Sequence, residues 1–272
     1  MSDQPLARKR IALLESRSSQ DIATLVKRLG GIPVAAPAVR EVPRDEDVSA
    51  FVGGVAARRF ELGIFQTGAG ASSLLRQAEE RGAFAEVLEG LRRMTIACRG
   101  PKPLSVMRKS GVPVAITTEK PHTTRELLAA LGSTELRDRG VLLVHYGERN
   151  TAMAEALIER GARLTEVCPY AWTLPEDRAP LESVIRDGVA GTLDAMLFTN
   201  QVQCRHLFEV ARGMNLAEPL AARLNSDIVV GAVGPVVADA LRAAGVTPDV
   251  LPASPTMVSL ITAVGDYFEL TQ

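Results

Sequence analysis

The chain repeats one pattern of apolar runs, turns and helices with a period of 133 residues, the separation of Leu62 from Ala195. The run 62–65 matches the run 195–198, and a Gly-Pro pair follows each at nearly the same distance, Gly100–Pro101 and Gly234–Pro235. Each pair precedes a helical pattern that ends at a glycine, after which we expect a short strand and a further helix. A chain of 272 residues that contains such a unit twice is long enough for two cores, and we expect two domains.

The beginning of each copy repeats more loosely. Arg10–Leu14 matches Gly140–Val144, and a polar turn and a helical pattern follow each of them, at 20–29 and 151–160. The apolar runs are continuous rather than alternating, which is typical of parallel strands covered by helices on both faces. The pattern predicts strand–helix–strand units with right-handed crossovers, and therefore an α/β fold.

Two proline-bracketed segments occupy matching places in the middle of the two copies, at 36–43 and 166–175. Proline restricts its own backbone and that of the preceding residue, so both segments favour an extended conformation. The second contains Tyr170 and the only tryptophan, Trp172. We interpret both segments as connectors.

The composition disfavours several classes of function. The net charge is −1 and aromatic residues make up 4%, which leaves no electrostatic or stacking footprint for a nucleic acid partner. No apolar run approaches the ~20 residues that span a bilayer, and the first ten residues carry no apolar signal segment. Cys98, Cys168 and Cys204 are odd in number and far apart, which disfavours disulfides and a zinc site. We expect a cytoplasmic protein, without a membrane partner, that binds a small or medium organic molecule.

Four loops at the expected carboxyl ends of strands are candidate binding sites, because ligands of open parallel sheets bind where strands lead into helices. These loops are 66–72, 99–102, 199–201 and 234–237. A helix start offers main-chain N–H groups and a positive dipole end, which suit carboxylates or phosphates. A Gly-Pro helix start is also an ordinary structural signal, so any one loop can be purely structural. Gly68–Ala69–Gly70 lacks the third glycine and the acidic residue of a dinucleotide loop.

Nucleophilic and metal chemistry has no strong candidate. His122, His145 and His206 lack the spacing of metal ligands, and no serine-hydrolase elbow occurs. Cys204 lies in a helical pattern, where we expect a small core residue. His145 directly follows an apolar run, a position from which it either lines a site or makes structural hydrogen bonds.

From about Arg10 to Val264 the chain resembles the uroporphyrinogen III synthases. The matching pieces, in order, are Ser16–Arg17, Gly147–Glu148–Arg149, Tyr170, Phe198–Thr199–Asn200, Val233–Gly234–Pro235 with Ala238, Ala240 and Leu241, and Ala253–Ser254–Pro255–Thr256. Each piece is a weak motif, whereas their order and spacing together are specific.

The resemblance implies a fold and a reaction. The fold has two parallel-sheet, three-layer (flavodoxin-like) domains joined by two extended linkers, one discontinuous over about 1–38 and 172–272 and the other over 39–171. The reaction is a lyase reaction of tetrapyrrole (heme) biosynthesis, in which hydroxymethylbilane, a linear polycarboxylate, loses water and closes to uroporphyrinogen III with inversion of its terminal ring. The family uses no metal or organic cofactor, and we expect a monomer.

The resemblance also implies site residues. Tyr170 would help the hydroxyl leave, although a linker tyrosine can equally pack against a domain. Arg17, Lys102 and Arg149 would bind substrate carboxylates, although isolated cations are more often solvated. The loop residues assigned to substrate are Gln66, Thr67, Gly68, Gly100, Thr199, Asn200, Gly234, Val236 and Val237.

Three departures from the family pattern favour an alternative function. Val236 and Val237 stand where the family usually has hydroxyl residues, and Lys102–Pro103 stands where a threonine is expected. The alternative is a non-catalytic relative that binds a tetrapyrrole or another polycarboxylate as a sensor or regulatory module.

Overall fold

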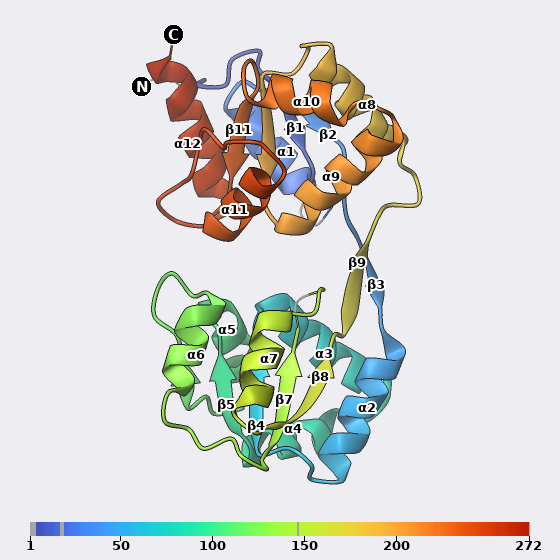
Figure 1. Cartoon of the computed structure of the whole chain (residues 1–272), viewed down its shortest axis with the longest axis vertical. Helices are drawn as coiled ribbons and strands as arrows, with labels where there is room; N and C mark the ends of the chain where they lie inside the picture. Colours follow the sequence, from blue (N-terminus) through green and yellow to red (C-terminus); the bar gives the residue numbers. More distant parts are fainter. Residues whose placement is uncertain (1–3, 17–18, 146, 272) are drawn as a thin grey trace. The chain divides into compact units, whose positions relative to one another are not determined.

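The computed structural model describes residues 4–16, 19–145 and 147–271, and it divides the chain into two compact units. Unit 1 comprises Met1–Arg40 and Thr173–Gln272, and unit 2 comprises Glu41–Trp172. The boundaries fall in β3 (Arg40–Pro43) and β9 (Tyr170–Thr173), which pair as a two-stranded sheet (Figure 1). The boundaries implied by the family resemblance, 38/39 and 171/172, differ from these by two residues and by one.

Each unit is built on a parallel sheet. In unit 1 the order is β11-β10-β1-β2, and in unit 2 it is β6-β5-β4-β7-β8. The strands of unit 1 are β1 (Arg10–Leu13), β2 (Ile32–Ala35), β10 (Ala195–Phe198) and β11 (Val229–Ala232). The strands of unit 2 are β4 (Leu62–Phe65), β5 (Thr95–Cys98), β6 (Ile116–Thr117), β7 (Gly140–Val144) and β8 (Arg163–Val167).

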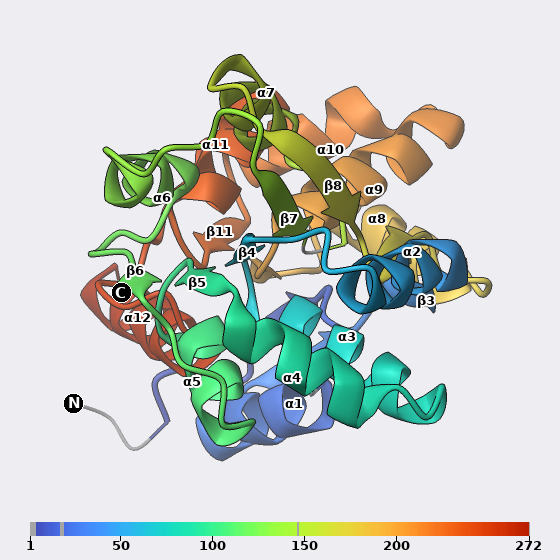
Figure 2. The same ribbon diagram turned by 90° about the horizontal axis from the view of Figure 1, so that it is seen from below.

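Helices cover both faces of each sheet, as Figures 1 and 2 show. In unit 1, α1 (Ser19–Arg28) and α12 (Met257–Leu270) pack on one face, and α8 (Ala179–Val189), α9 (Gln201–Gly213), α10 (Ala217–Leu224) and α11 (Pro235–Ala243) on the other. In unit 2, α6 (Thr124–Leu131) and α7 (Thr151–Glu159) pack on one face, and α2 (Asp45–Ala56), α3 (Gly68–Glu80), α4 (Phe84–Arg93) and α5 (Pro101–Lys109) on the other. Both units are therefore three-layered, as the continuous apolar runs predict.

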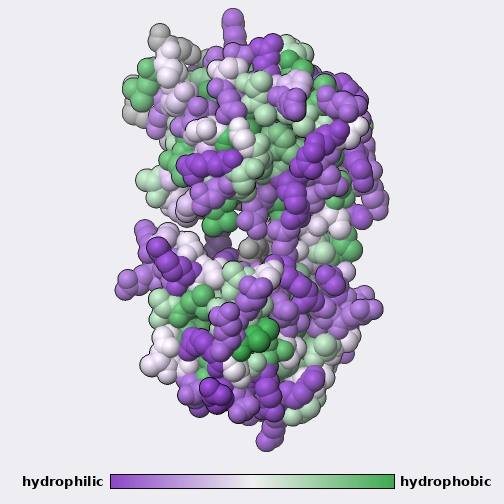
Figure 3. All heavy atoms as spheres, in the orientation of Figure 1, coloured by the Kyte–Doolittle hydropathy of each residue, from purple (hydrophilic) through white to green (hydrophobic). Residues whose placement is uncertain are grey.

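The strands are apolar throughout because successive side chains enter different cores. In β1, Ile11 and Leu13 join the cluster under α1 and α12, whereas Ala12 packs in the cluster under α8–α11. In β7, Val141 alternates with Leu142 in the same way between the two cores of unit 2. Figure 3 shows the complementary pattern outside, where polar side chains cover most of the drawn face.

Each unit takes half of each sequence copy. Unit 1 joins β1 and β2 of the first copy to β10 and β11 of the second, and unit 2 joins β4, β5 and β6 of the first to β7 and β8 of the second. The copies differ at one sheet edge. Where the first copy has β6, the second has a single bridge between Val250 and Gly231, a shorter element than the predicted strand. Pro248 and Pro252 flank Val250, and proline has no N–H to donate to a strand partner.

Among the glycines of unit 2, Gly140 leaves the least room for a side chain, so its replacement should destabilise the fold. A Cβ at this position would lie 1.7 Å from the carbonyl oxygen of Arg59, whereas a Cβ at Gly53 on α2 would meet nothing within 4 Å. Gly140→Ala should cost at least about 2 kcal/mol of unfolding free energy through overpacking. Gly53→Ala should stabilise by about 0.5–1 kcal/mol, because glycine is a poor residue in a helix. Denaturant unfolding followed by the fluorescence of Trp172 measures both; equal stabilities would contradict the prediction.

Candidate functional site

The central strand pair of each sheet is a topological switch point. In unit 1 the chain runs outward from β1 to β2 and in the opposite direction from β10 to β11. In unit 2 it runs outward from β7 to β8 and in the opposite direction from β4 to β5. The loops that follow the central strands therefore diverge, and open parallel sheets bind ligands where this happens. The residues just beyond these strands are the first candidates for a site.

At the switch point of unit 1, Glu15 follows β1 and Thr199 follows β10. The Thr199 hydroxyl donates to Oε2 of Glu15 at 2.5 Å, and the Gln203 side-chain amide donates to the same oxygen at 3.4 Å. The main-chain N–H of Ser16 donates to the other oxygen, Oε1, at 3.0 Å. Gln203 is fully buried at the start of α9. The Glu15 carboxylate is thus held in place by two loops.

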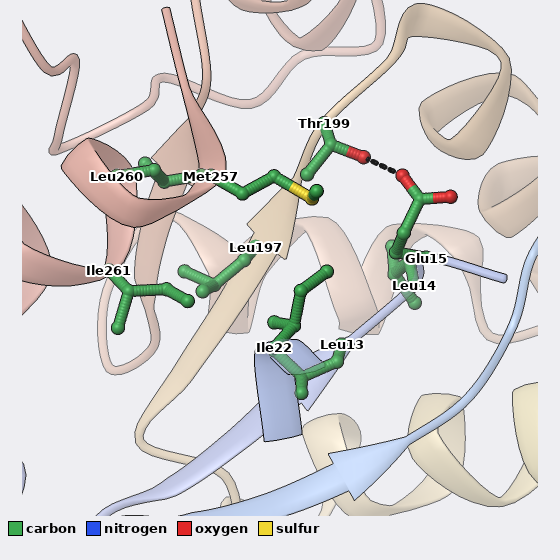
Figure 4. A pocket seen from close by; sticks show the side chains of 9 residues that line it. All are labelled: Leu13, Leu14, Glu15, Ile22, Leu197, Thr199, Met257, Leu260 and Ile261. Carbon is green, nitrogen blue, oxygen red and sulfur yellow. Dashed lines mark hydrogen bonds between the residues drawn. The ribbon is translucent and has the colours of Figure 1, made fainter. Parts of the chain in front are cut away.

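A pocket opens beside this carboxylate. Its nine lining residues come from β1, β10, α1 and α12 and the turns after the strands: Leu13, Leu14, Glu15, Ile22, Leu197, Thr199, Met257, Leu260 and Ile261. Figure 4 shows Glu15 and Thr199 joined at one side, while the side chain of Met257 extends from α12 toward the strand ends. Apart from Glu15 and Thr199 the wall is apolar.

The switch point of unit 2 is closed instead. Gln66 follows β4 and His145 follows β7, and their side chains are 2% and 0% exposed. Nε2 of Gln66 lies 3.3 Å from Nδ1 of His145, and the main-chain N–H of Asn150 donates to that same Nδ1 at 3.1 Å. The side-chain amide of Asn150 donates to Oε1 of Gln66 and to the Thr124 hydroxyl, each at 2.8 Å. Gln66 therefore serves an internal network.

These contacts fix the protonation of His145. Because Nδ1 accepts from the Asn150 main chain, the ring proton is on Nε2, which donates to Oε2 of Glu166 at 2.7 Å. Burial lowers the pKa of His145, and the hydrogen bond to Glu166 only partly opposes this. His145 is thus a neutral structural histidine, the second of the two roles that the sequence left open.

The four candidate helix starts divide into two kinds. Thr67 caps α3 by accepting from the N–H of Gly70, and Asn200 caps α9 by accepting from the N–H groups of Val202 and Gln203. The Gly-Pro starts at Gly100 and Gly234 have no side-chain cap among the described residues. The side chains of the first two loops therefore occupy some of the N–H groups at their helix starts, which leaves the Gly-Pro loops as the stronger binding candidates.

The two Gly-Pro starts differ in the donors they present. Pro101 and Pro103 have no N–H, so the first turn of α5 offers the N–H of Lys102, whose side chain is exposed. The first turn of α11 offers the N–H groups of Val236 and Val237. Val236 is 49% exposed and Val237 is 5% exposed, so only the first of these two side chains reaches a ligand.

The glycines near the α5 start permit close packing. A Cβ at Gly68 would lie 3.0 Å from Cβ of Lys102, and one at Gly70 would lie 2.5 Å from the carbonyl oxygen of His145. Gly100 has φ +89°, and a Cβ there would meet the ring of His122 at 3.0 Å. Gly68 and Gly70 thus bring α3 against its neighbours, which gives both glycines a packing role.

The remaining predicted residues occupy different surroundings. Arg149 lies 3.4 Å from both Asp47 and Glu166, so two carboxylates already balance its charge. Tyr170 is 2% exposed, with its ring centroid 5.8 Å from that of Trp172, and a Cβ at Gly147 would lie within 2.7 Å of both rings. Arg17 lies outside the described residues.

Sequence reasoning missed Glu15 and His122. Alignment of the two copies gives the signal for Glu15, because Leu14 matches Val144 and Phe65 matches Phe198. That alignment places Glu15 opposite His145 and Thr199 opposite Gln66, so both copies carry a polar pair beyond the central strands. His122 lies beside Gly100 because of the way its loop folds, and no sequence motif predicts this position.

Comparison with known proteins identifies the family. The model of the family described as uroporphyrinogen-III synthase HemD matches residues 20–262. The chain belongs to the uroporphyrinogen-III synthase family. YjjA, an uncharacterized protein of Bacillus subtilis, is 31% identical to it over 266 residues, covering 96% of both chains. A candidate uroporphyrinogen-III synthase of Methanothermobacter thermautotrophicus is 27% identical, covering 90% of this chain and 93% of the relative.

Solved structures agree with this family. A mutant uroporphyrinogen III synthase of Thermus thermophilus superimposes with a TM-score of 0.76 at 24% identity, covering 97% of this chain and 100% of that one. The wild-type enzyme in another crystal form gives a TM-score of 0.61 at 27% identity, with 97% and 99% covered. The uroporphyrinogen-III synthase family thus supplies both the sequence match and the fold. No helix in residues 4–16, 19–145 and 147–271 is long and apolar enough to cross a bilayer.

The buried His145 gives a pH prediction. Its pKa is lower in the folded than in the unfolded protein, so the unfolded state binds more protons and stability falls as pH drops below about 6.5. Glu166 contacts the ring, and Arg149 and Asp47 are the other charged groups close enough to act on the pKa of His145. His145→Gln keeps an amide donor for Glu166 and an acceptor for Asn150. It should remove this dependence of the unfolding free energy on pH.

Unfolding monitored through Trp172 between about pH 7.5 and 5.5 tests it, above the range in which ordinary carboxylates titrate. In the wild type, the unfolding free energy should change with pH by at most about 1.4 kcal/mol per pH unit, the limit for one proton. Glu166→Gln retains the histidine and removes the anion that favours its charged form, so it should keep or steepen the slope. A slope that persists in His145→Gln would contradict this account.

Proposed function

We propose that the protein is a uroporphyrinogen III synthase that converts hydroxymethylbilane into uroporphyrinogen III by dehydration, inversion of the terminal ring and closure. The observation that carries the proposal is the family match over residues 20–262, on a fold with a switch point in each unit. We also propose a cytoplasmic location and a monomer; the three free, buried cysteines support a reducing compartment.

The chemistry suits a protein that positions its substrate. The pyrrole nitrogen lends its electrons as the hydroxyl leaves, so no protein nucleophile is required. The two ends of a flexible chain must then meet, and holding reacting groups together contributes several kcal/mol, about 7–11 in the best-oriented cases. The residues needed for this work are ones that bind carboxylates and rings in fixed places.

The Gly-Pro starts are the proposed carboxylate sites. At α5 the N–H and side chain of Lys102 act together, with Arg99 in the same loop and His122 beside Gly100. At α11 the N–H groups of Val236 and Val237 point out of the first helical turn. Main-chain donors at a helix start bind anions without a strongly basic protein surface, in agreement with a net charge of −1.

Tyr170 is the proposed donor to the leaving hydroxyl. Its phenol is buried beside Trp172 and the Gly147 turn, and a buried donor acts more strongly on a developing charge than one in water.

Incubation with freshly generated hydroxymethylbilane tests the function. Type III product well above the spontaneous type I background supports the enzyme. Binding of the substrate with only type I product supports the regulatory module, which the valines at 236 and 237 favour. Tyr170→Phe should lower kcat by about 10- to 1000-fold through loss of one donor, with little change in KM. Unchanged kcat would remove Tyr170 from the mechanism.

The valines permit a gain-of-function prediction. Val236→Thr adds a hydroxyl at an exposed position where the family usually has one, and it should raise kcat/KM severalfold, up to about tenfold for one good hydrogen bond. Val237→Thr is the matched control. It buries the same hydroxyl in the core under α11, so it should cost about 1–3 kcal/mol of stability without improving kcat/KM. Equal effects at both positions would contradict the assignment of Val236 as the side chain that faces substrate.

A further inference from the structure

The side chain of Gln77 joins α3 to the segment that precedes Tyr170. Its Nε2 donates to the carbonyl oxygen of Pro169 at 2.8 Å and to the Ser73 hydroxyl at 3.1 Å. Gln77 is 1% exposed, and its Oε1 meets no hydrogen-bond donor among the residues that the structure describes. Methionine would fill the same space without an unsatisfied oxygen. The amide at this position is therefore explained by the groups to which its nitrogen donates.

The bond to Pro169 fixes the backbone at Tyr170. The peptide group is planar, so a held Pro169 oxygen sets the orientation of the peptide that links Pro169 to Tyr170. The main-chain N–H of Arg44 donates to the same oxygen at 3.2 Å. On the other side of the tyrosine, the thiol of Cys168 donates to the Tyr170 carbonyl oxygen at 2.9 Å. Both peptide groups that flank the Tyr170 Cα are held, which fixes the direction in which the phenol leaves the main chain.

The other unit contains an equivalent contact. His206 lies on α9, one period of 133 residues after Ser73 on α3, and its Nδ1 donates to the carbonyl oxygen of Ala38 at 2.7 Å. His206 is 5% exposed. Ala38 belongs to the first connector and Pro169 to the second. In both units, therefore, the helix that follows β4 or β10 binds a connector carbonyl through a buried polar side chain.

The residue that follows the held carbonyl differs between the units. In unit 1 it is Val39, an apolar side chain that is 2% exposed, and in unit 2 it is Tyr170. A valine needs only to be buried, whereas a phenol that donates to a leaving group must also point in one direction. The contact of Gln77 therefore has a consequence for reactivity that the contact of His206 lacks.

We propose that Gln77 is a positioning residue, which fixes the Tyr170 phenol through its hydrogen bond to the Pro169 carbonyl. In this assignment Gln77 does not touch the substrate and acts only through Tyr170. The effect on catalysis rests on the proposed function, whereas the effect on the orientation of the phenol does not. The two effects are therefore measured separately.

Fluorine NMR of the full chain reports on the phenol without requiring activity. The three tyrosines are replaced by meta-fluorotyrosine, and Tyr170→Phe and Tyr267→Phe assign their resonances. Gln77→Met removes the amide donor and keeps a similar volume, and Arg44 still donates to the Pro169 oxygen, so the variant should fold. The Tyr170 resonance should shift or split in this variant. The resonance of Tyr267, on α12 of unit 1, should stay in place.

Turnover of hydroxymethylbilane measures the catalytic consequence. Gln77→Met should lower kcat by about 10-fold, since a displacement of about 1 Å costs up to ~100-fold. KM should stay unchanged, because no contact with substrate is removed. In the Tyr170→Phe background the same substitution should cost less than about 2-fold, because the hydroxyl that it positions is gone. Additive losses in the double variant would show that Gln77 acts elsewhere.

Two control variants separate positioning from stability. Ser73→Ala removes the other acceptor of the same amide and keeps the bond to Pro169, so the Tyr170 resonance and kcat should match those of the wild type. Leu74→Val leaves a small cavity in the core of unit 2 from the same helix, which measures the effect of lost stability alone. Gln77→Leu is a second apolar variant, and unfolding curves show which variants are folded.

The outcomes separate this inference from the proposed function. A Tyr170 resonance that moves in the Gln77 variants and not in the controls, without type III product from the wild type, supports the positioning role and refutes the enzyme. Type III product, with an unchanged resonance and kcat in Gln77→Met, supports the enzyme and overturns the positioning role. An equal shift in Ser73→Ala or Leu74→Val also overturns it. Failure of both apolar Gln77 variants to fold assigns the contact to stability alone, with the same result.

Discussion

The parallel pairing of the two central strands is the constraint on which the rest of the structure depends. In unit 1, β1 pairs with β10 in a register that places Ile11 beside Ala195, and in unit 2, β4 pairs with β7 with Leu62 beside Val141. Each pairing joins a strand of one sequence copy to a strand of the other. It also brings the residues that follow both strands together, which places Thr199 on Glu15 and Gln66 against His145.

Duplication preserved this framework while the two switch points acquired different chemistry. In unit 2 the buried pair recruits Asn150, Thr124 and Glu166 into a network that holds the loop after β7. In unit 1 the corresponding carboxylate lies on an apolar pocket. A buried polar group must find its partners within the protein, so the network of unit 2 stabilises the fold, whereas the pair of unit 1 is only half-buried.

The helix starts differ in a similar way, in whether side chains of the protein occupy their main-chain N–H groups. Thr67 and Asn200 occupy N–H groups that would otherwise bind an anion, whereas no described side chain caps the Gly-Pro starts. The two valines that stand where the family usually has hydroxyl residues also differ, because Val236 is exposed and Val237 packs in the core. The loss of a hydroxyl that bears on substrate binding is therefore confined to Val236.

The sequence by itself determined the strand–helix alternation, the helices on both faces of parallel sheets, the helix starts at Pro101 and Pro235, and the burial of Cys204, because apolar periodicity and proline act locally. From residue patterns alone, the choice of strand partners was open, since the matching runs of the two copies are nearly interchangeable; only the family resemblance implied a discontinuous domain. The tertiary structure decided that each unit takes half of each copy. It also decided which polar pair closed into a network and which remained on a pocket, because burial depends on side chains distant in sequence, such as Met257 on α12 and Asn150 before α7.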